Sequence, residues 1–233
     1  MYYDLHIHSA LSPCAENEMT PNNICNMAII KGLELIAVTD HNSVKQLPAF
    51  SVCAERLGVK ALYGAELQTA EEVHILGLFR NVDDALKLQP WIDEHMPSIP
   101  NKIDFFGDEW ICSAEDEFIE QEERLLLVSL TATLEETIDE IHALGGRAIL
   151  AHVLDRENSV TNQLGFIPDG LAYDGLEIKS LEEIPRVLKT NPWIKEEETV
   201  WLIDSDAHRL IDMAEAEHYM TTSTFNRLWG DEA

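Results

Sequence analysis

Three observations predict an α/β fold in which a mainly parallel sheet curls into a barrel. Short runs rich in Val, Ile, Leu and Tyr alternate with amphipathic helical patterns along the 233 residues. Seven such runs are present, which favours a barrel over an open sheet. The length suits one barrel of this kind. The sequence therefore predicts an α/β protein whose strands end on one common face.

The expected strands are short and are bounded by glycine or polar residues. They cover residues 2–7, 34–38, 59–63, 73–79, 147–151, 175–178 and 200–203. Because helical patterns separate most of them, we expect βαβ units and a mainly parallel sheet.

The expected helices have recognisable ends. Thr20 is a good N-cap, Pro21 fits the first helical position, and Gly32 is a typical C-terminal stop. A second helix is expected over residues 44–57. A third begins with the capping box Thr133-Leu-Glu-Glu136 and carries apolar residues on one face.

Residues 81–131 interrupt this alternation. The segment contains several prolines, two tryptophans and an acidic block at 115–123. We interpret it as an insertion or cap over the strand ends, within a single domain spanning residues 1–233. The acidic block is expected to be a solvated turn or hairpin.

The composition narrows the function classes. Sixteen Lys and Arg stand against 43 Asp and Glu, a formal net charge of −27, so extended nucleic-acid binding is not expected. The acidity is either solvated surface or carboxylates that gather around cations. No apolar run is long enough to cross a membrane, and no secretory signal is visible at the N-terminus. The four cysteines are scattered and form no C-x-x-C pair, which predicts reduced thiols in the cytoplasm.

Six of the nine histidines lie within or just after predicted strands. They are His6, His8, His41, His74, His152 and His208, and Asp40, Glu66 and Asp206 are interleaved with them. His6 and His8 are two residues apart on a strand, so their imidazoles point to the same face. Strand ends of a barrel converge, and imidazole with carboxylate suits Mn²⁺, Fe²⁺ or Zn²⁺. So many ligands predict a two- or three-metal cluster, which typically serves hydrolysis or phosphoryl transfer.

Five motifs in order resemble the PHP (polymerase and histidinol phosphatase) superfamily. They are Asp4-Leu5-His6-Ile7-His8-Ser9, Ala37-Val38-Thr39-Asp40-His41-Asn42, Gly64-Ala65-Glu66, Ala151-His152 and Ser205-Asp206-Ala207-His208. The resemblance implies a distorted (β/α)₇ barrel with a metal cluster at the C-terminal ends of the strands. It also implies hydrolysis of phosphate esters at a trinuclear metal centre.

The resemblance also implies a set of ligands. His6, His8, Glu66 and Asp206 would hold one metal, and Glu66 would bridge to a second held by His74 and His152. His41 and His208 would hold the third, with an acidic residue from the loop after the first strand. Most relatives have a Ser-Asp-Gly turn there, whereas this chain has Ser-Pro-Cys-Ala-Glu-Asn-Glu at residues 12–18. Counting back from Thr20-Pro21 selects Glu16, with Cys14 and Glu18 as alternatives.

Other residues near the motifs have two interpretations each. Arg156 either clamps a substrate phosphate or is a surface arginine, and with Asp206 and His208 it is a candidate catalytic residue. Asp40 is expected to orient a histidine, and Glu177 either supports the metal ligands or pairs with Lys179. Asn42 either orders the turn after His41 or contacts a ligand.

These expectations predict a metal-dependent phosphoesterase with up to three divalent ions, Mn, Fe or Zn. It would hydrolyse a small phosphorylated substrate through a metal-activated bridging hydroxide. Two alternatives stay open. A nuclease acting on nucleic-acid ends would need a basic track, and none is visible. A non-catalytic metal-binding regulatory module would need a missing ligand.

Overall fold

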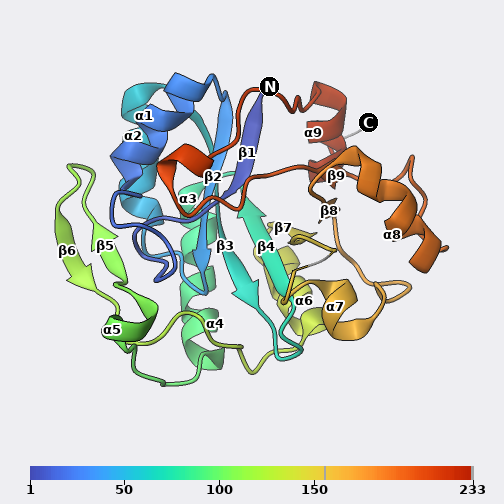
Figure 1. The fold of residues 1–233 in the computed structure, drawn as a ribbon, viewed down its shortest axis with the longest axis horizontal. Helices are drawn as coiled ribbons and strands as arrows, with labels where there is room; N and C mark the ends of the chain where they lie inside the picture. Colours follow the sequence, from blue (N-terminus) through green and yellow to red (C-terminus); the bar gives the residue numbers. More distant parts are fainter. Residues whose placement is uncertain (155, 232–233) are drawn as a thin grey trace.

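A curled seven-stranded sheet forms the centre of the molecule in the computed structural model, which describes residues 1–154 and 156–231 (Figure 1). In spatial order the strands are β1 (Tyr3–Ile7), β2 (Leu35–His41), β3 (Lys60–Gln68), β4 (His74–Phe79), β7 (Arg147–Leu150), β8 (Gly175–Glu177) and β9 (Trp201–Leu202). Ile7 forms a parallel bridge with Ala207, just beyond β9. The two sheet edges therefore approach each other, and the distorted α/β barrel expected from the sequence is confirmed.

One strand departs from the expected parallel arrangement. All seven expected strands form, but β4 runs antiparallel to both β3 and β7. The connection between β3 and β4 is a short turn, in which the Thr69 N–H donates to the Val73 carbonyl at 2.9 Å. Because this turn has no room for a crossover helix, the strand must reverse. His74 consequently begins its strand, yet lies at the same edge of the sheet as the ends of its neighbours.

The helices that cover the sheet have the ends that the sequence predicts. Helix α1 (Pro21–Lys31) begins after the N-cap Thr20 and ends at Gly32, whose φ is 74°. Helix α6 (Leu134–Ala143) has the expected capping box. Helix α2 (Leu47–Leu57) begins three residues later than expected, because Pro48 fits only the first turn. The remaining helices of the barrel are α7 (Val160–Leu164), α8 (Ile184–Thr190) and α9 (Thr222–Trp229).

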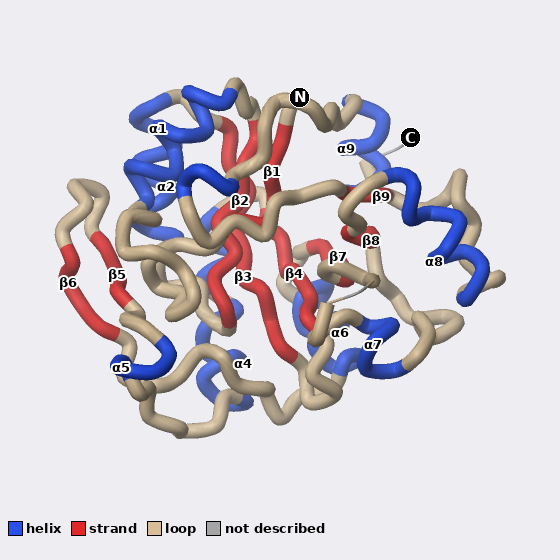
Figure 2. Tube along the Cα trace, in the orientation of Figure 1, coloured by secondary structure: helices blue, strands red, loops and turns tan. Residues whose placement is uncertain are grey.

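Residues 81–131 contain short elements at one side of the sheet (Figure 2). They are α3 (Val82–Leu86), α4 (Leu88–His95), α5 (Ile103–Phe106) and a hairpin of β5 (Trp110–Cys112) with β6 (Phe118–Gln121). The acidic block forms the hairpin turn and its second strand. The hairpin is tied to the barrel by Gln46, whose side chain bonds the backbone N–H and carbonyl of Cys112 at 2.9 and 3.0 Å.

Alternate residues of the strands pack on opposite faces of the curled sheet. Ile36 and Val38 of β2 belong to the large core under the outer helices. Leu35 and Ala37 belong to a smaller core with Leu76 and Trp229, the last of which comes from α9. The barrel interior is therefore filled by side chains. No helix in the two described ranges is both long and apolar enough to span a bilayer.

Candidate metal centre

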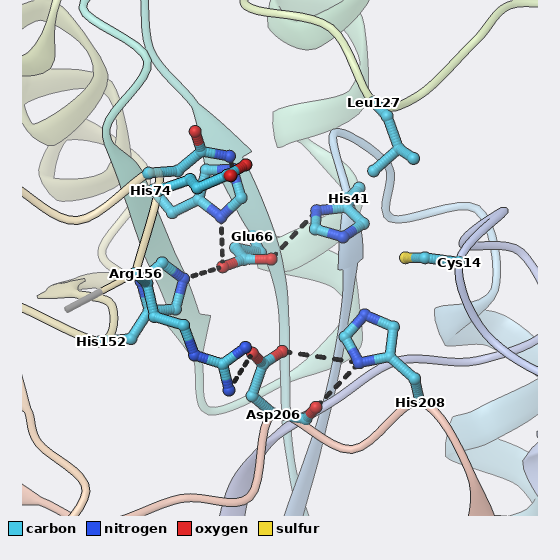
Figure 3. A pocket seen from close by; sticks show the side chains of 11 residues that line it. Cys14, His41, Glu66, His74, Leu127, His152, Arg156, Asp206 and His208 are labelled. Atoms are coloured by element: carbon cyan, nitrogen blue, oxygen red, sulfur yellow. Dashed lines mark hydrogen bonds and ion pairs between the residues drawn. The ribbon is translucent and has the colours of Figure 1, made fainter. Parts of the chain in front are cut away.

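Glu66 lies at the centre of a cluster of histidines (Figure 3). The cluster is at the end of the sheet where β1, β2 and β3 finish. It is 1% exposed and belongs to β3. Its Oε1 lies 2.7 Å from His74 Nδ1, 3.1 Å from His152 Nε2 and 3.3 Å from His6 Nε2. Its Oε2 lies 3.0 Å from His41 Nδ1. One buried carboxylate thus joins ligands from four different strands or strand ends.

The first group of ligands comprises His6, His8, Glu66 and Asp206, whose ligand atoms lie within 4.8 Å of one another. His6 Nε2 and His8 Nε2 are 3.2 Å apart. Asp206 Oδ1 faces them at 3.4 and 3.3 Å. The same-face geometry of residues two apart on β1 brings the two imidazoles together.

Two further groups share residues with the first. His41, Glu66 and His74 form one, and His152 reaches the same carboxylate oxygen as His74. His8, His41 and His208 form the other. The structure therefore brings together all of the expected histidine and carboxylate ligands except Glu16.

Glu16 lies outside these groups. Glu16 is exposed, and its N–H donates to the His208 carbonyl at 2.9 Å. The residue does not line the wall of the pocket that opens above the cluster. Cys14, one of the two alternatives, lies on that wall with its sulfur turned toward His41 and His208. Desolvation opposes ionisation of the thiol, but His41 and His208 outweigh it and lower the pKa of Cys14 to about 6.

Buried carboxylates outside the groups hold the histidine rings. Glu177 Oε2 lies 2.9 Å from His6 Nδ1, so the Nε2 atom of that ring is left for an ion. His8 Nδ1 lies 3.1 Å from the Ser12 hydroxyl, which donates to Asp40 at 2.7 Å. Asp40 thus orients His8 through Ser12.

The electrostatics of the site depend on burial and on mutual interactions of its charges. Burial opposes ionisation of Glu66, but His74, His6 and His41 hold its pKa well below the usual range. Burial and the charges of His41 and His208 hold the pKa of His8 well below its ordinary value. A neutral imidazole beside an ionised carboxylate is the state that binds a metal ion.

Backbone strain is concentrated at this edge. Asn42, His152 and Asp206 have φ values of 43°, 31° and 53°, in a region that costs non-glycine residues about 1–3 kcal/mol each. The Asn42 side chain donates to the carbonyls of Leu126 and Val128 at 2.8 and 2.7 Å. It therefore ties the loop from the 81–131 segment to the site.

A pocket of about 350 Å³ opens above the cluster. Besides ligands of the groups, its wall contains Cys14, Leu127, Arg156, Glu157 and Asn158. Among the described residues that line this wall, Arg156 is the only lysine or arginine, and its Nη2 atom lies 3.3 Å from Asp206 Oδ2. The Asn158 amide contacts His74 Nε2 at 2.8 Å.

Sequence reasoning did not single out Ser12, Leu127 or Asn158. Ser12 stands next to the first motif, so its contact with His8 could be sought there. No sequence pattern predicts that Leu127 or Asn158 lines the pocket, because the course of a loop brings each of them there. Of the two roles expected for Glu177, the structure shows a contact with His6.

The residues of the cluster fit divalent metal ions. Glu66 Oε2 is buried and has no hydrogen-bond partner, although imidazoles surround it. Buried carboxylates in such a position are ordinarily paired with a cation. Nitrogen and oxygen donors without an obligatory thiolate suit Mn²⁺, Fe²⁺ or Zn²⁺.

The fold and the cluster define an α/β barrel protein with a candidate multi-metal site at one edge of the sheet. The PHP domain family model matches residues 4–163, and the chain therefore belongs to the PHP domain family.

The chain is also similar in sequence to individual proteins over part of its length. A phosphoribosyl 1,2-cyclic phosphate 1,2-diphosphodiesterase of Eggerthella lenta is 35% identical over 83 residues, 34% of this chain and 30% of that protein. A 5'-3' exoribonuclease of Haemophilus influenzae is 29% identical over 79 residues, 33% of this chain and 28% of that protein. This chain thus matches 30% or less of the length of either relative.

A crystal structure extends the likeness over the whole chain. It is that of a candidate metal-dependent phosphoesterase from Bifidobacterium adolescentis, with a TM-score of 0.65 and 15% identity. The match covers 99% of this chain and 96% of that one. At this identity the likeness shows a shared fold.

Proposed function

We propose that this protein is a metal-dependent phosphoesterase that hydrolyses a small phosphate ester. The observation that carries the proposal is a set of three ligand groups that share residues, two of them through Glu66, at a pocket with Arg156 on its wall. The cyclic phosphodiesterase and the exoribonuclease among its relatives both cleave phosphate esters, which supports this general class.

The ligand groups suggest how up to three ions, Mn, Fe or Zn, would be held. The first would be held by His6, His8, Glu66 and Asp206, and the second by Glu66, His74 and His152. The third would be held by His41 and His208 with a residue of the loop after β1. The ions would offset the charge of phosphoryl oxygens and activate a bridging water as hydroxide.

Asp206 links the ligands to the pocket wall. Its Oδ1 faces His6 and His8, whereas its Oδ2 faces Arg156. Arg156 is 48% exposed, so its guanidinium can turn from Asp206 to a phosphate and bind two of its oxygens. His208 Nδ1 donates to the Asp206 carbonyl at 2.8 Å, which leaves Nε2 as the ligand atom of that ring.

The size of the pocket and the net charge of the chain favour a small substrate over a polymer. A volume of about 350 Å³ is at the lower end of the range for small-molecule sites. The net charge of −27 repels a long phosphate backbone. The exoribonuclease relative keeps action on nucleic-acid ends as the second candidate.

A reconstituted enzyme tests both candidates. Metal-free protein is loaded with Mn²⁺, Zn²⁺ or Fe²⁺ and assayed on p-nitrophenyl phosphate, its bis ester, mononucleotides, cyclic phosphates, sugar phosphates and a short 5'-labelled RNA. We expect metal-dependent hydrolysis of small esters, which releases phosphate from monoesters and nitrophenol or a monoester from diesters. Asp206→Asn should lower the rate by roughly 100-fold or more, because the variant loses a charged ligand.

A matched variant guards against general damage. His142→Gln changes a histidine of α6 whose Nε2 contacts Asp174 at 2.7 Å, away from the cluster, and it should retain full activity. Turnover of the RNA alone would favour the nuclease. Failure to hydrolyse any of these compounds with any of the metals would contradict the proposal and favour a non-catalytic metal-binding module.

A further inference from the structure

The loop after β1 presents a cysteine, and not a carboxylate, to the third group of ligands. Cys14 lines the pocket together with His41 and His208, and Figure 3 shows its sulfur turned toward both rings. Its neighbourhood also contains the buried Glu66 Oε2, which lacks a hydrogen-bond partner and lies 3.0 Å from His41 Nδ1. The cysteine therefore adds a donor to a group that is already suited to a cation.

The path of the loop favours Cys14 over Glu16. The Glu16 N–H is bonded to the His208 carbonyl, and the Ala15 N–H is bonded to the Ser12 carbonyl, both at 2.9 Å. On its other side the loop packs on Gly107, where an added Cβ would lie 2.2 Å from the Pro13 carbonyl oxygen. Backbone contacts on both sides thus hold the loop with residue 14 toward the pocket.

The surroundings of the Glu16 carboxylate also favour Cys14 over Glu16. Glu16 interacts electrostatically with Arg209, an exposed residue that is itself paired with Asp212 at 2.6 Å. To reach His41 or His208, the Glu16 side chain would have to leave this exposed position, and its backbone bond to the His208 carbonyl would limit the movement.

We propose that Cys14 supplies a thiolate ligand to the third metal site, together with His41 and His208. This inference rests on the proposed multi-metal site and deepens it. On binding, the sulfur gives its proton to solvent and forms a metal–sulfur bond. A thiolate with two imidazoles favours Zn²⁺ or Co²⁺ over Mn²⁺. The third site should therefore prefer a softer ion than the two sites made of imidazole and carboxylate alone.

Cobalt substitution tests the bond directly. Metal-free full-length protein is titrated with Co²⁺, and the near-ultraviolet charge-transfer band of a thiolate–Co²⁺ bond is recorded. We expect the band in the unaltered protein and in Glu16→Gln, and we expect its loss in Cys14→Ser. Equilibrium dialysis should show a third-site Zn²⁺ affinity about 10–100-fold lower in Cys14→Ser, since loss of a ligand costs at least as much as loss of its support.

A second variant keeps the test independent of folding. Cys14→Asp supplies a carboxylate at the same position, so it should recover third-site occupancy without the band and should bind Mn²⁺ there more tightly than the unaltered protein does. Absence of the band in the unaltered protein, or its persistence in Cys14→Ser, would overturn the proposal, and so would loss of third-site metal in Glu16→Gln. None of these readouts depends on turnover. A protein that shows the band but hydrolyses no ester would contradict the proposed function alone.

Discussion

Glu109 is a buried carboxyl that the structure leaves without a donor on one oxygen. It precedes β5 and is fully buried. Its Oε1 accepts from the Leu126 N–H at 2.8 Å, whereas its Oε2 has no hydrogen-bond partner. Burial raises the pKa of Glu109 to about 8. A retained proton keeps the buried Oε2 from carrying a charge without a partner.

The raised pKa makes folding dependent on pH in a defined direction. Between about pH 4.5 and pH 8 the folded state holds a proton on Glu109 that the unfolded state has released. Stability contributed by this group is therefore complete below pH 4.5 and is lost as the pH rises through 8. The shift corresponds to an upper limit of about 5 kcal/mol, and buried charged groups without partners typically cost roughly 1–3 kcal/mol or more.

Glu109→Gln isolates this contribution, because glutamine has the hydrogen-bonding pattern of the protonated acid. We expect the variant and the unaltered protein to be about equally stable at pH 5, and the variant to be more stable by roughly 1–3 kcal/mol at pH 9. Urea unfolding of metal-free protein at several pH values measures the difference. Glu120→Gln removes an exposed charge from the same hairpin and should show no such trend. Parallel stability curves for Glu109→Gln and the unaltered protein would refute the reasoning.

Three further variants address the cluster and its frame. Glu177→Gln removes the charge beside His6 Nδ1 and should weaken metal binding about 10–100-fold in competition with a chelating dye; unchanged affinity would show that the contact is only structural. Arg156→Ala should leave metal content intact but lower kcat/KM for phosphate esters roughly 10–100-fold, and equal kinetics would make it a surface arginine. In Gly64→Ala, the new Cβ would lie 2.1 Å from the Gly77 carbonyl oxygen. Gly64→Ala should lower the free energy of unfolding by about 1–3 kcal/mol. An unchanged denaturation midpoint would contradict the close approach of Gly64 and Gly77.

Local signals in the sequence predicted much of the fold. The Thr20 and Thr133 caps and the Gly32 stop are encoded within a few neighbouring residues, so they could be read directly. The sequence does not predict the direction of β4, because a strand has the same alternation in either direction. Only the short connection after β3 forces the reversal.

The candidate site likewise contains some contacts that local spacing predicts and others that depend on the fold. His6 and His8 share one strand, so their common face follows from spacing. The approach of Glu66 to His152 depends on how the sheet curls, and the resemblance to a family supplied it where spacing could not. The choice between Cys14 and Glu16 depends on the contacts of the loop with residues 107 and 208, which no local pattern encodes.

Metal loading followed together with turnover tests the proposed multi-metal phosphoesterase most directly. Metal-free protein is titrated with Mn²⁺ or Zn²⁺, and bound metal per chain and phosphate release are measured on the same samples. We predict no hydrolysis at zero metal and a rate that rises only after more than one ion is bound per chain, because Glu66 belongs to two of the ligand groups. Full activity in the metal-free protein, or no activity at any loading, would contradict it.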